Sequence, residues 1–109
     1  MNTSLCRIRP DNYLQEVALA DKPVLMLCMP FNEAFPSQLK VVEAVADQMK
    51  AVVKVGLLDE AFIDTFKKNL QISGTPTFLI MVKGKERSRM IGLADHQMLS
   101  DFIAGTTVA

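Results

Sequence analysis

The apolar residues of the chain fall into two kinds of segment, which alternate along the sequence. Three segments are nearly continuous apolar runs, which is typical of strands that are buried on both faces of a sheet. These runs cover residues 24–29, 51–58 and 77–82. A short alternating stretch at 5–8 predicts another strand, and so does the segment 86–91, which follows the turn Lys83-Gly84-Lys85 as the second arm of an antiparallel hairpin.

Between these runs, apolar residues recur at steps of three and four, as they do on one face of a helix. Asp11 and Asp59 are candidate N-caps of the first and third helices, and Gln38 is expected on the polar face of the second. The last helix should start near Asp95 and end before Gly105. The predicted apolar faces, helix by helix, are Tyr13, Leu14, Val17 and Ala18; Leu39, Val42, Val45, Ala46 and Met49; Phe62, Ile63, Phe66 and Leu70; Leu99, Phe102 and Ile103.

The order of these elements predicts an α/β protein with a mixed central sheet. Strands and helices follow one another as β-α-β-α-β-α-β-β-α, which gives a sheet of about five strands with about four helices on its two faces. With 109 residues, the chain is expected to form a single domain that covers 1–109.

The charged residues argue against some classes of partner. Twelve basic and twelve acidic residues cancel, and neither sign forms a run, so there is no electrostatic basis for binding nucleic acid or an anionic membrane. No apolar run approaches the length of about 18 residues that spans a bilayer, and residues 1–9 contain no apolar leader segment. We therefore expect a cytoplasmic protein whose cysteines are reduced.

Three local features have the spacing of a known family. The segment 74–78, with the sequence Gly-Thr-Pro-Thr-Phe, precedes an apolar strand, Gly92 follows the predicted hairpin, and 24–49 reads as a strand, a turn and a long helix. With the element order, these features resemble the thioredoxin family over nearly the whole chain. The resemblance implies the thioredoxin fold, a cis bond before Pro76, a Thr75 backbone that pairs with an extended peptide, and close approach of a ligand at Gly92.

The redox motif of this family is absent. The family's Trp-Cys-Gly-Pro-Cys segment would lie over residues 32–36, where the sequence is Asn-Glu-Ala-Phe-Pro, so Glu33 and Pro36 occupy the positions of the two thiols. The buried acid of the family would fall on Leu27, which cannot titrate. Because dithiol exchange needs two thiols in one short turn, the resemblance implies a redox-inactive protein.

The two cysteines leave a different thiol chemistry open. In the sheet order that the resemblance implies, another strand separates Cys6 from Cys28, so their Cα atoms would be about 9.5 Å apart. A disulfide tolerates only about 7 Å. Cys28 alone could serve as an atypical monothiol oxidoreductase or redox sensor, which would require an exposed and acidic thiol. Its place inside the most apolar run favours inert core packing.

No cluster of ligand residues predicts a metal site or a cofactor. His96 is the only histidine, and a zinc site needs several converging ligands. The sequence contains neither a Gly-rich phosphate loop nor a nucleophile elbow. For the methionines that fall in apolar stretches, Met26, Met49, Met81 and Met98, we expect core packing.

The turn at 29–36 provides the remaining candidate site. Several of its residues are large and apolar, and if exposed beside Thr75-Pro76 and Gly92 they would form a shallow groove, as interaction sites often do. An equally good interpretation is that Phe31 and Phe35 fold back onto the core.

The leading hypothesis is a redox-inactive binding or chaperone-type module that holds an extended peptide or a partner protein at this former active-site face. Its candidate binding residues are Met29, Phe31, Glu33, Phe35, Thr75, Pro76, Gly92 and Leu93, with Glu33 and Pro36 as the altered active-site positions. One alternative is the monothiol enzyme that uses Cys28, and another is a structural domain that dimerises through the apolar loop or the last strand. We expect a monomer or weak homodimer with a protein or peptide partner, and no nucleic acid, membrane, metal or cofactor.

Overall fold

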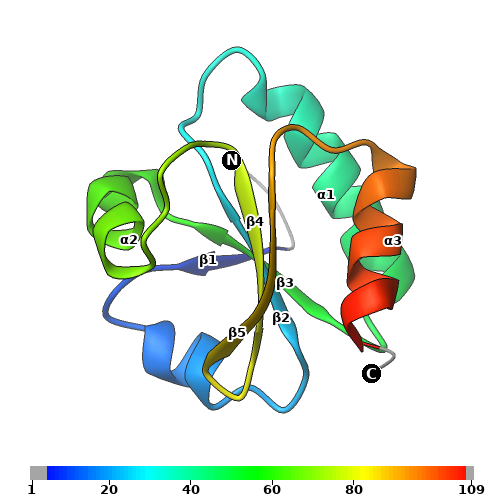
Figure 1. Ribbon diagram of the computed structural model, residues 1–109, viewed down its shortest axis with the longest axis horizontal. Coiled ribbons are helices and arrows are strands. Elements are labelled where there is room, and N and C mark those ends of the chain that lie inside the picture. Colours follow the sequence, from blue (N-terminus) through cyan, green and yellow to red (C-terminus); the bar gives the residue numbers. More distant parts are fainter. Residues whose placement is uncertain (1–4, 108–109) are drawn as a thin grey trace.

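The computed structural model describes residues 5–107, and Figure 1 shows how its elements are arranged. Residues 1–4 and 108–109, the two ends of the single domain predicted from the sequence, lie outside the described residues. The described strands are β1 (Cys6–Ile8), β2 (Val24–Cys28), β3 (Lys54–Leu58), β4 (Thr77–Val82) and β5 (Lys85–Ile91). The described helices are the π-helix η1 (Leu14–Ala18), α1 (Phe35–Met49), the 3₁₀ turn η2 (Glu60–Phe62) that leads into α2 (Ile63–Asn69), and α3 (His96–Thr107).

Within residues 5–107, the five strands form one mixed sheet in the order β1-β3-β2-β4-β5. β1 and β2 are both parallel to β3, whereas β4 is antiparallel to β2 and β5 is antiparallel to β4. For this part of the chain, the predicted α/β class is therefore confirmed, with a mixed five-stranded sheet and four helical segments.

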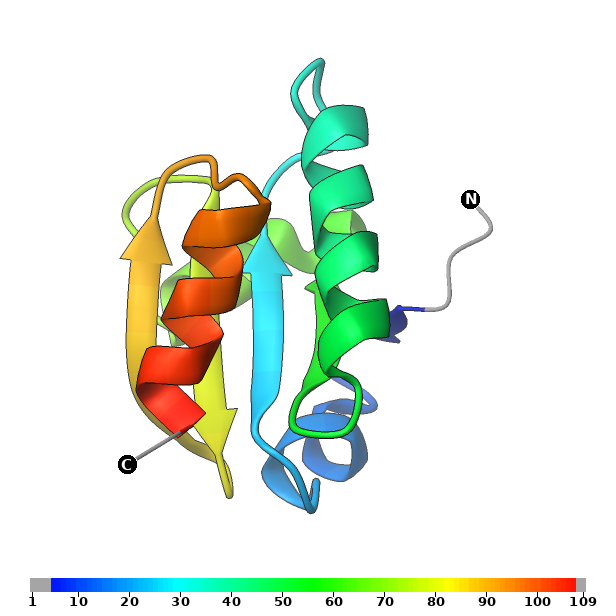
Figure 2. The ribbon, with the colours of Figure 1, turned by 90° about the vertical axis from the view of Figure 1, so that its right-hand side faces the viewer.

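The sheet lies between two layers of helices. α1 and α3 lie side by side in front of one face in Figure 2, while η1 and α2 pack on the other face. Each face has its own apolar core, which is formed by alternate residues of the strands.

β2 explains why its part of the sequence lacks alternation. All five of its residues are buried, because the strand is central and both of its faces are covered. Leu25 and Leu27 belong to the core under α1 and α3. Val24, Met26 and Cys28 belong to the core under η1 and α2.

The predicted antiparallel hairpin is confirmed, with a turn one residue shorter than expected. Lys83 and Gly84 have positive φ angles of 52° and 82°, as in the two-residue turns that match the twist of paired strands. Lys85 already pairs with Val82, so it belongs to β5 and not to the turn.

Two predicted helix starts are confirmed. The Asp59 carboxylate accepts the N–H of Ala61 at 2.9 Å, although the turn that it caps is the 3₁₀ segment η2. At the start of α3, the carboxylate of Asp95 accepts the N–H of Met98 at 2.8 Å.

Some expectations about local structure are wrong. The strand predicted over 51–58 begins only at Lys54, and Leu14 and Phe62, assigned to apolar helix faces, are 58% and 38% exposed. Asp11 forms an ion pair with Arg9 at 3.1 Å and does not cap η1. α3 continues through Gly105, because the glycine adopts helical geometry there and is not used as a stop signal. Met98 is 47% exposed, since it lies on the solvent side of the first turn of α3, whereas Met26 and Met81 are buried as expected.

Among residues 5–107, no helix is both long enough and apolar enough to cross a membrane.

Candidate functional site

The pairing of the strands brings three loops to one end of the sheet. Thr77, the first residue of β4, pairs with Cys28 at the end of β2 and with Ile91 at the end of β5. The loop after β2, the segment before β4 and the loop after β5 must therefore be neighbours. They lie at the upper end of the sheet in Figure 2. We call the surface formed by residues 29–36, 74–76 and 91–94 the loop face.

The segment before β4 is the centre of the loop face. Thr75 is exposed, and the peptide bond between Thr75 and Pro76 is cis. The hydroxyl of Thr77 donates to the carbonyl of Gly74 at 2.6 Å, which closes the turn. Among the described residues, the backbone N–H and C=O of Thr75 have no hydrogen-bond partner. These two groups are free to pair with a ligand backbone.

Two glycines flank this free backbone. The N–H of Gly92 donates to the carbonyl of Pro76 at 2.9 Å, so the loop after β5 lies directly beside the Thr75 segment. The φ angle of Gly92 is +107°, a conformation that residues with a side chain rarely adopt. Apart from the atoms of each glycine and of its two chain neighbours, no described atom lies within 4 Å of where a Cβ would be at Gly74 or Gly92. The space around Thr75 is therefore open.

The 29–36 loop corrects the expectation of an exposed apolar groove. Met29 and Phe35 are each 2% exposed and lie in the core under α1 and α3, so they cannot contact a ligand directly. Phe31 is half-buried and stacks on Phe35 with 4.0 Å between ring centroids. For these residues the second interpretation, in which the aromatic rings fold back, describes the structure.

Two charged residues hold Phe31 in this position. The backbone N–H of Phe31 donates to the carboxylate of Glu60, the first residue of η2. The guanidinium of Arg7 in β1 lies 5.7 Å from the centroid of the Phe31 ring, within the range of a cation–π contact. Contacts from β1 and from the start of η2 therefore hold this part of the loop.

Exposed apolar side chains of the loop face come instead from the end of β5 and the loop after it. Ile91 is 63% exposed and Leu93 is 55% exposed. Of these, only Leu93 was among the residues predicted from the sequence. Glu33 and Pro36, which the resemblance predicted as altered active-site positions, are both exposed.

Gln38 was missed as a residue of this site. The sequence analysis placed it on the polar face of α1, but its side chain is 3% exposed. It donates to the carbonyl of Ala94 and accepts the N–H of Ala94, both at 2.9 Å. Its spacing to Val42 and Val45 could have revealed this position, because steps of four and three place all three residues on one helix face.

Cys28 lies beneath the loop face and is fully buried. Burial raises its pKa from the ordinary value of 9.0 to about 11, and the nearby charge of Lys67 only partly offsets this. At neutral pH the side chain is therefore a neutral thiol inside the core. The requirement of the monothiol hypothesis for an exposed, acidic thiol is not met.

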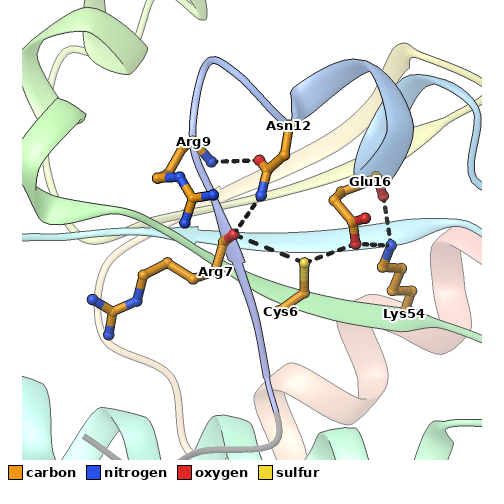
Figure 3. Close-up of polar contacts among 6 residues, drawn as sticks. All are labelled: Cys6, Arg7, Arg9, Asn12, Glu16 and Lys54. Carbon is orange, nitrogen blue, oxygen red and sulfur yellow. Dashed lines mark hydrogen bonds and ion pairs between the residues drawn. The ribbon is translucent and has the colours of Figure 1, made fainter.

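Cys6 lies in a polar network near the start of β1, which Figure 3 shows. Its Sγ donates a hydrogen bond to Oε1 of Glu16 at 3.0 Å, and the same oxygen accepts a hydrogen bond from Nζ of Lys54 at 2.8 Å. Burial and the hydrogen bond to Glu16 raise the pKa of Cys6 to about 11. Both cysteines are free thiols, and β3 separates their strands, as the disulfide argument assumed.

The described residues include no group of three or more His, Cys, Asp or Glu side chains that could hold a metal ion. His96 is exposed at the start of α3.

Comparison with known proteins adds no assignment: no protein-family model matches the sequence, and no curated protein matches it at a significant level.

Proposed function

We propose that this protein is a redox-inactive, thioredoxin-like binding or chaperone-type module, which holds an extended peptide or a segment of a partner protein at the loop face. The observation that supports this best is the free, exposed backbone of Thr75. An extended chain can add to such a backbone through main-chain hydrogen bonds, as in strand-addition complexes. The open space at Gly74 and Gly92 leaves room for that chain to approach closely.

The thioredoxin-like part of the proposal is supported by the topology. The strand order β1-β3-β2-β4-β5, with an antiparallel β4–β5 hairpin, agrees with the fold that the resemblance implies. The 29–36 loop, the Thr75 segment and Gly92 also meet at one end of the sheet, as the resemblance requires.

The redox-inactive part is supported by the chemistry of the loop face. Its two family thiol positions are Glu33 and Pro36. Of the two cysteines in the chain, Cys28 is buried beneath the face, and Cys6 is hydrogen-bonded to Glu16. The pKa of each thiol is about 11, so neither provides a nucleophilic thiolate at neutral pH.

The apolar contacts of a bound segment come from Ile91 and Leu93 in this proposal. Both side chains are more than half exposed, and the two residues flank Gly92, whose N–H donates to the carbonyl of Pro76. Burial of such side chains stabilises a complex by roughly 25 cal/mol for each Å² of apolar surface removed from water.

The proposal is tested by selecting peptides from a phage-displayed library of random linear sequences on the immobilised protein. We expect selection of peptides that bind at Thr75, detected as shifts of the Gly74, Thr75 and Gly92 amide signals in NMR spectra. Gly74→Ala should weaken binding about tenfold, because the added methyl group occupies space that the ligand backbone needs. It should leave folding unchanged, since that methyl group meets no described atom within 4 Å beyond Gly74 itself and its two chain neighbours.

The matched control is Gly105→Ala near the end of α3, where an added Cβ also meets no described atom within 4 Å. This variant should bind the selected peptides like the wild type. Failure to select any peptide, or equal binding by both glycine variants, would contradict the proposal.

A further inference from the structure

A buried amide joins the first turns of α1 to the loop after β5. Both hydrogen bonds of Gln38 go to the backbone of one residue, Ala94, whose N–H and C=O each find a partner at 2.9 Å. Ala94 is itself 6% exposed, so without Gln38 its backbone groups would be left buried and unpaired. The side-chain amide of Gln38 therefore pairs with both backbone groups of Ala94, as the backbone of a neighbouring strand would.

The same loop is tied on its other side to the segment before β4. The N–H of Gly92 donates to the carbonyl of Pro76 at 2.9 Å. Leu93 lies between Gly92 and Ala94, the two residues that make these hydrogen bonds, and its own side chain is exposed. The position of Leu93 relative to Thr75 is therefore fixed by the hydrogen bond from Gly92 to Pro76 on one side. On the other side it is fixed by the two hydrogen bonds between Ala94 and Gln38 of α1.

We infer that Gln38 is the positioning residue of the loop face: it holds the loop after β5 in place before a ligand arrives. This inference rests on the proposed function. Gln38 is 3% exposed, so it acts through Ala94 and not by touching the ligand. A loop that is already ordered loses less conformational freedom on binding, and this favours affinity.

Two variants separate positioning from general stability. Gln38→Met keeps the length and apolar stem of the side chain but removes both hydrogen bonds to Ala94. Val45→Ala is the control, because Val45 is fully buried about two turns further along the same helix. Val45→Ala should therefore lower the stability of the protein through a cavity beside α1, while both hydrogen bonds from Gln38 to Ala94 remain.

The first measurement is amide hydrogen exchange at Ala94, expressed relative to Phe78 in the centre of the sheet. We expect Gln38→Met to raise this relative rate about tenfold or more, whereas Val45→Ala leaves it unchanged. The second measurement is the affinity for a peptide that the wild type selects from the random library. We expect a loss of about tenfold in Gln38→Met and none in Val45→Ala.

An unchanged relative exchange rate at Ala94, or wild-type affinity of Gln38→Met for the selected peptide, would overturn the inference while leaving the proposed function standing. A wild-type protein that selects no peptide would instead remove the proposed function, and the binding role of Gln38 with it.

Discussion

The 29–36 loop and the 91–93 segment lie at the same end of the sheet and are both apolar, but they differ in exposure. Met29 and Phe35 are buried, whereas Ile91 and Leu93 are more than half exposed. Local composition therefore does not decide which segment can contact a partner.

The positions of the two strands in the sheet explain the difference. Met29 continues the alternation of Leu25 and Leu27 in the central strand β2, so it lies in the same core. Phe35 opens α1, whose inner face covers that core. Ile91, in contrast, ends the edge strand β5, where a side chain has fewer neighbours. If the proposed function holds, the binding surface therefore lies along β5 and its loop rather than on the 29–36 loop.

The largest loss of stability is expected for Phe35→Ser. Removing a buried aromatic side chain should lower the free energy of unfolding by about 3–5 kcal/mol, because it leaves a cavity and a hydroxyl in the core. Urea denaturation measures this. A loss below about 1 kcal/mol would show that Phe35 is exposed in solution and would restore the apolar groove predicted from the sequence.

The thiol directly before the loop offers a second test of its packing. With Cys6 changed to Ser, alkylation of Cys28 by iodoacetamide at neutral pH should be at least about a hundredfold slower than for an ordinary thiol, because the side chain is fully buried and burial raises its pKa. The unfolded protein in denaturant is the control. Fast alkylation of the native protein with a midpoint near or below the ordinary value of 9.0 would revive the monothiol hypothesis.

The same thiol predicts a pH dependence of stability. The pKa of Cys28 is raised on folding, so the folded state holds its proton more tightly than the unfolded state. The stabilisation is therefore complete below pH 9.0 and is lost as the pH rises to about 11. The free energy of unfolding should therefore fall less steeply between pH 9.0 and about 11 in Cys28→Ala than in the wild type. An identical pH dependence in the two proteins would contradict the raised pKa of Cys28.

A smaller effect is expected for Glu60→Ala, which removes the acceptor of the Phe31 N–H. We expect a loss of about 1 kcal/mol of stability and faster exchange of the Phe31 amide, because the loop loses a charge-assisted hydrogen bond. Glu33→Ala is the control in the same loop, since Glu33 is exposed and has no hydrogen-bond or ion-pair partner among the described residues. Equal effects of the two substitutions would mean that Glu60 does not hold the loop.

The smallest effect on stability is expected for Leu93→Ser, which should stay within about 0.5 kcal/mol of the wild type because the side chain is exposed. If the proposed function holds, this variant should bind the selected peptides more weakly. Leu19→Ser is its matched control, because Leu19 is 66% exposed and precedes β2 at the opposite end of the sheet. Equal loss of binding in both variants would argue against a specific role of Leu93.

Local sequence patterns were enough to predict the order of the strands and helices and their arrangement in layers. The apolar runs of β2 and β4 indicated strands covered on both faces, and the three- and four-residue steps of α1 indicated its buried stripe. Asp59 and Asp95 also marked the helix starts correctly, because capping depends on neighbours only two or three residues away. Local patterns of this kind need no knowledge of distant residues.

Local sequence patterns did not predict which apolar and polar residues are exposed at the loop face. Phe35 and Leu93 are both large apolar residues, and their exposure depends on whether the core beside the central strand or the edge strand lies next to them. The role of Gln38 depends on Ala94, which lies 56 residues away in the chain. Exposure and long-range pairing arise when distant segments pack together, so no local pattern determines them.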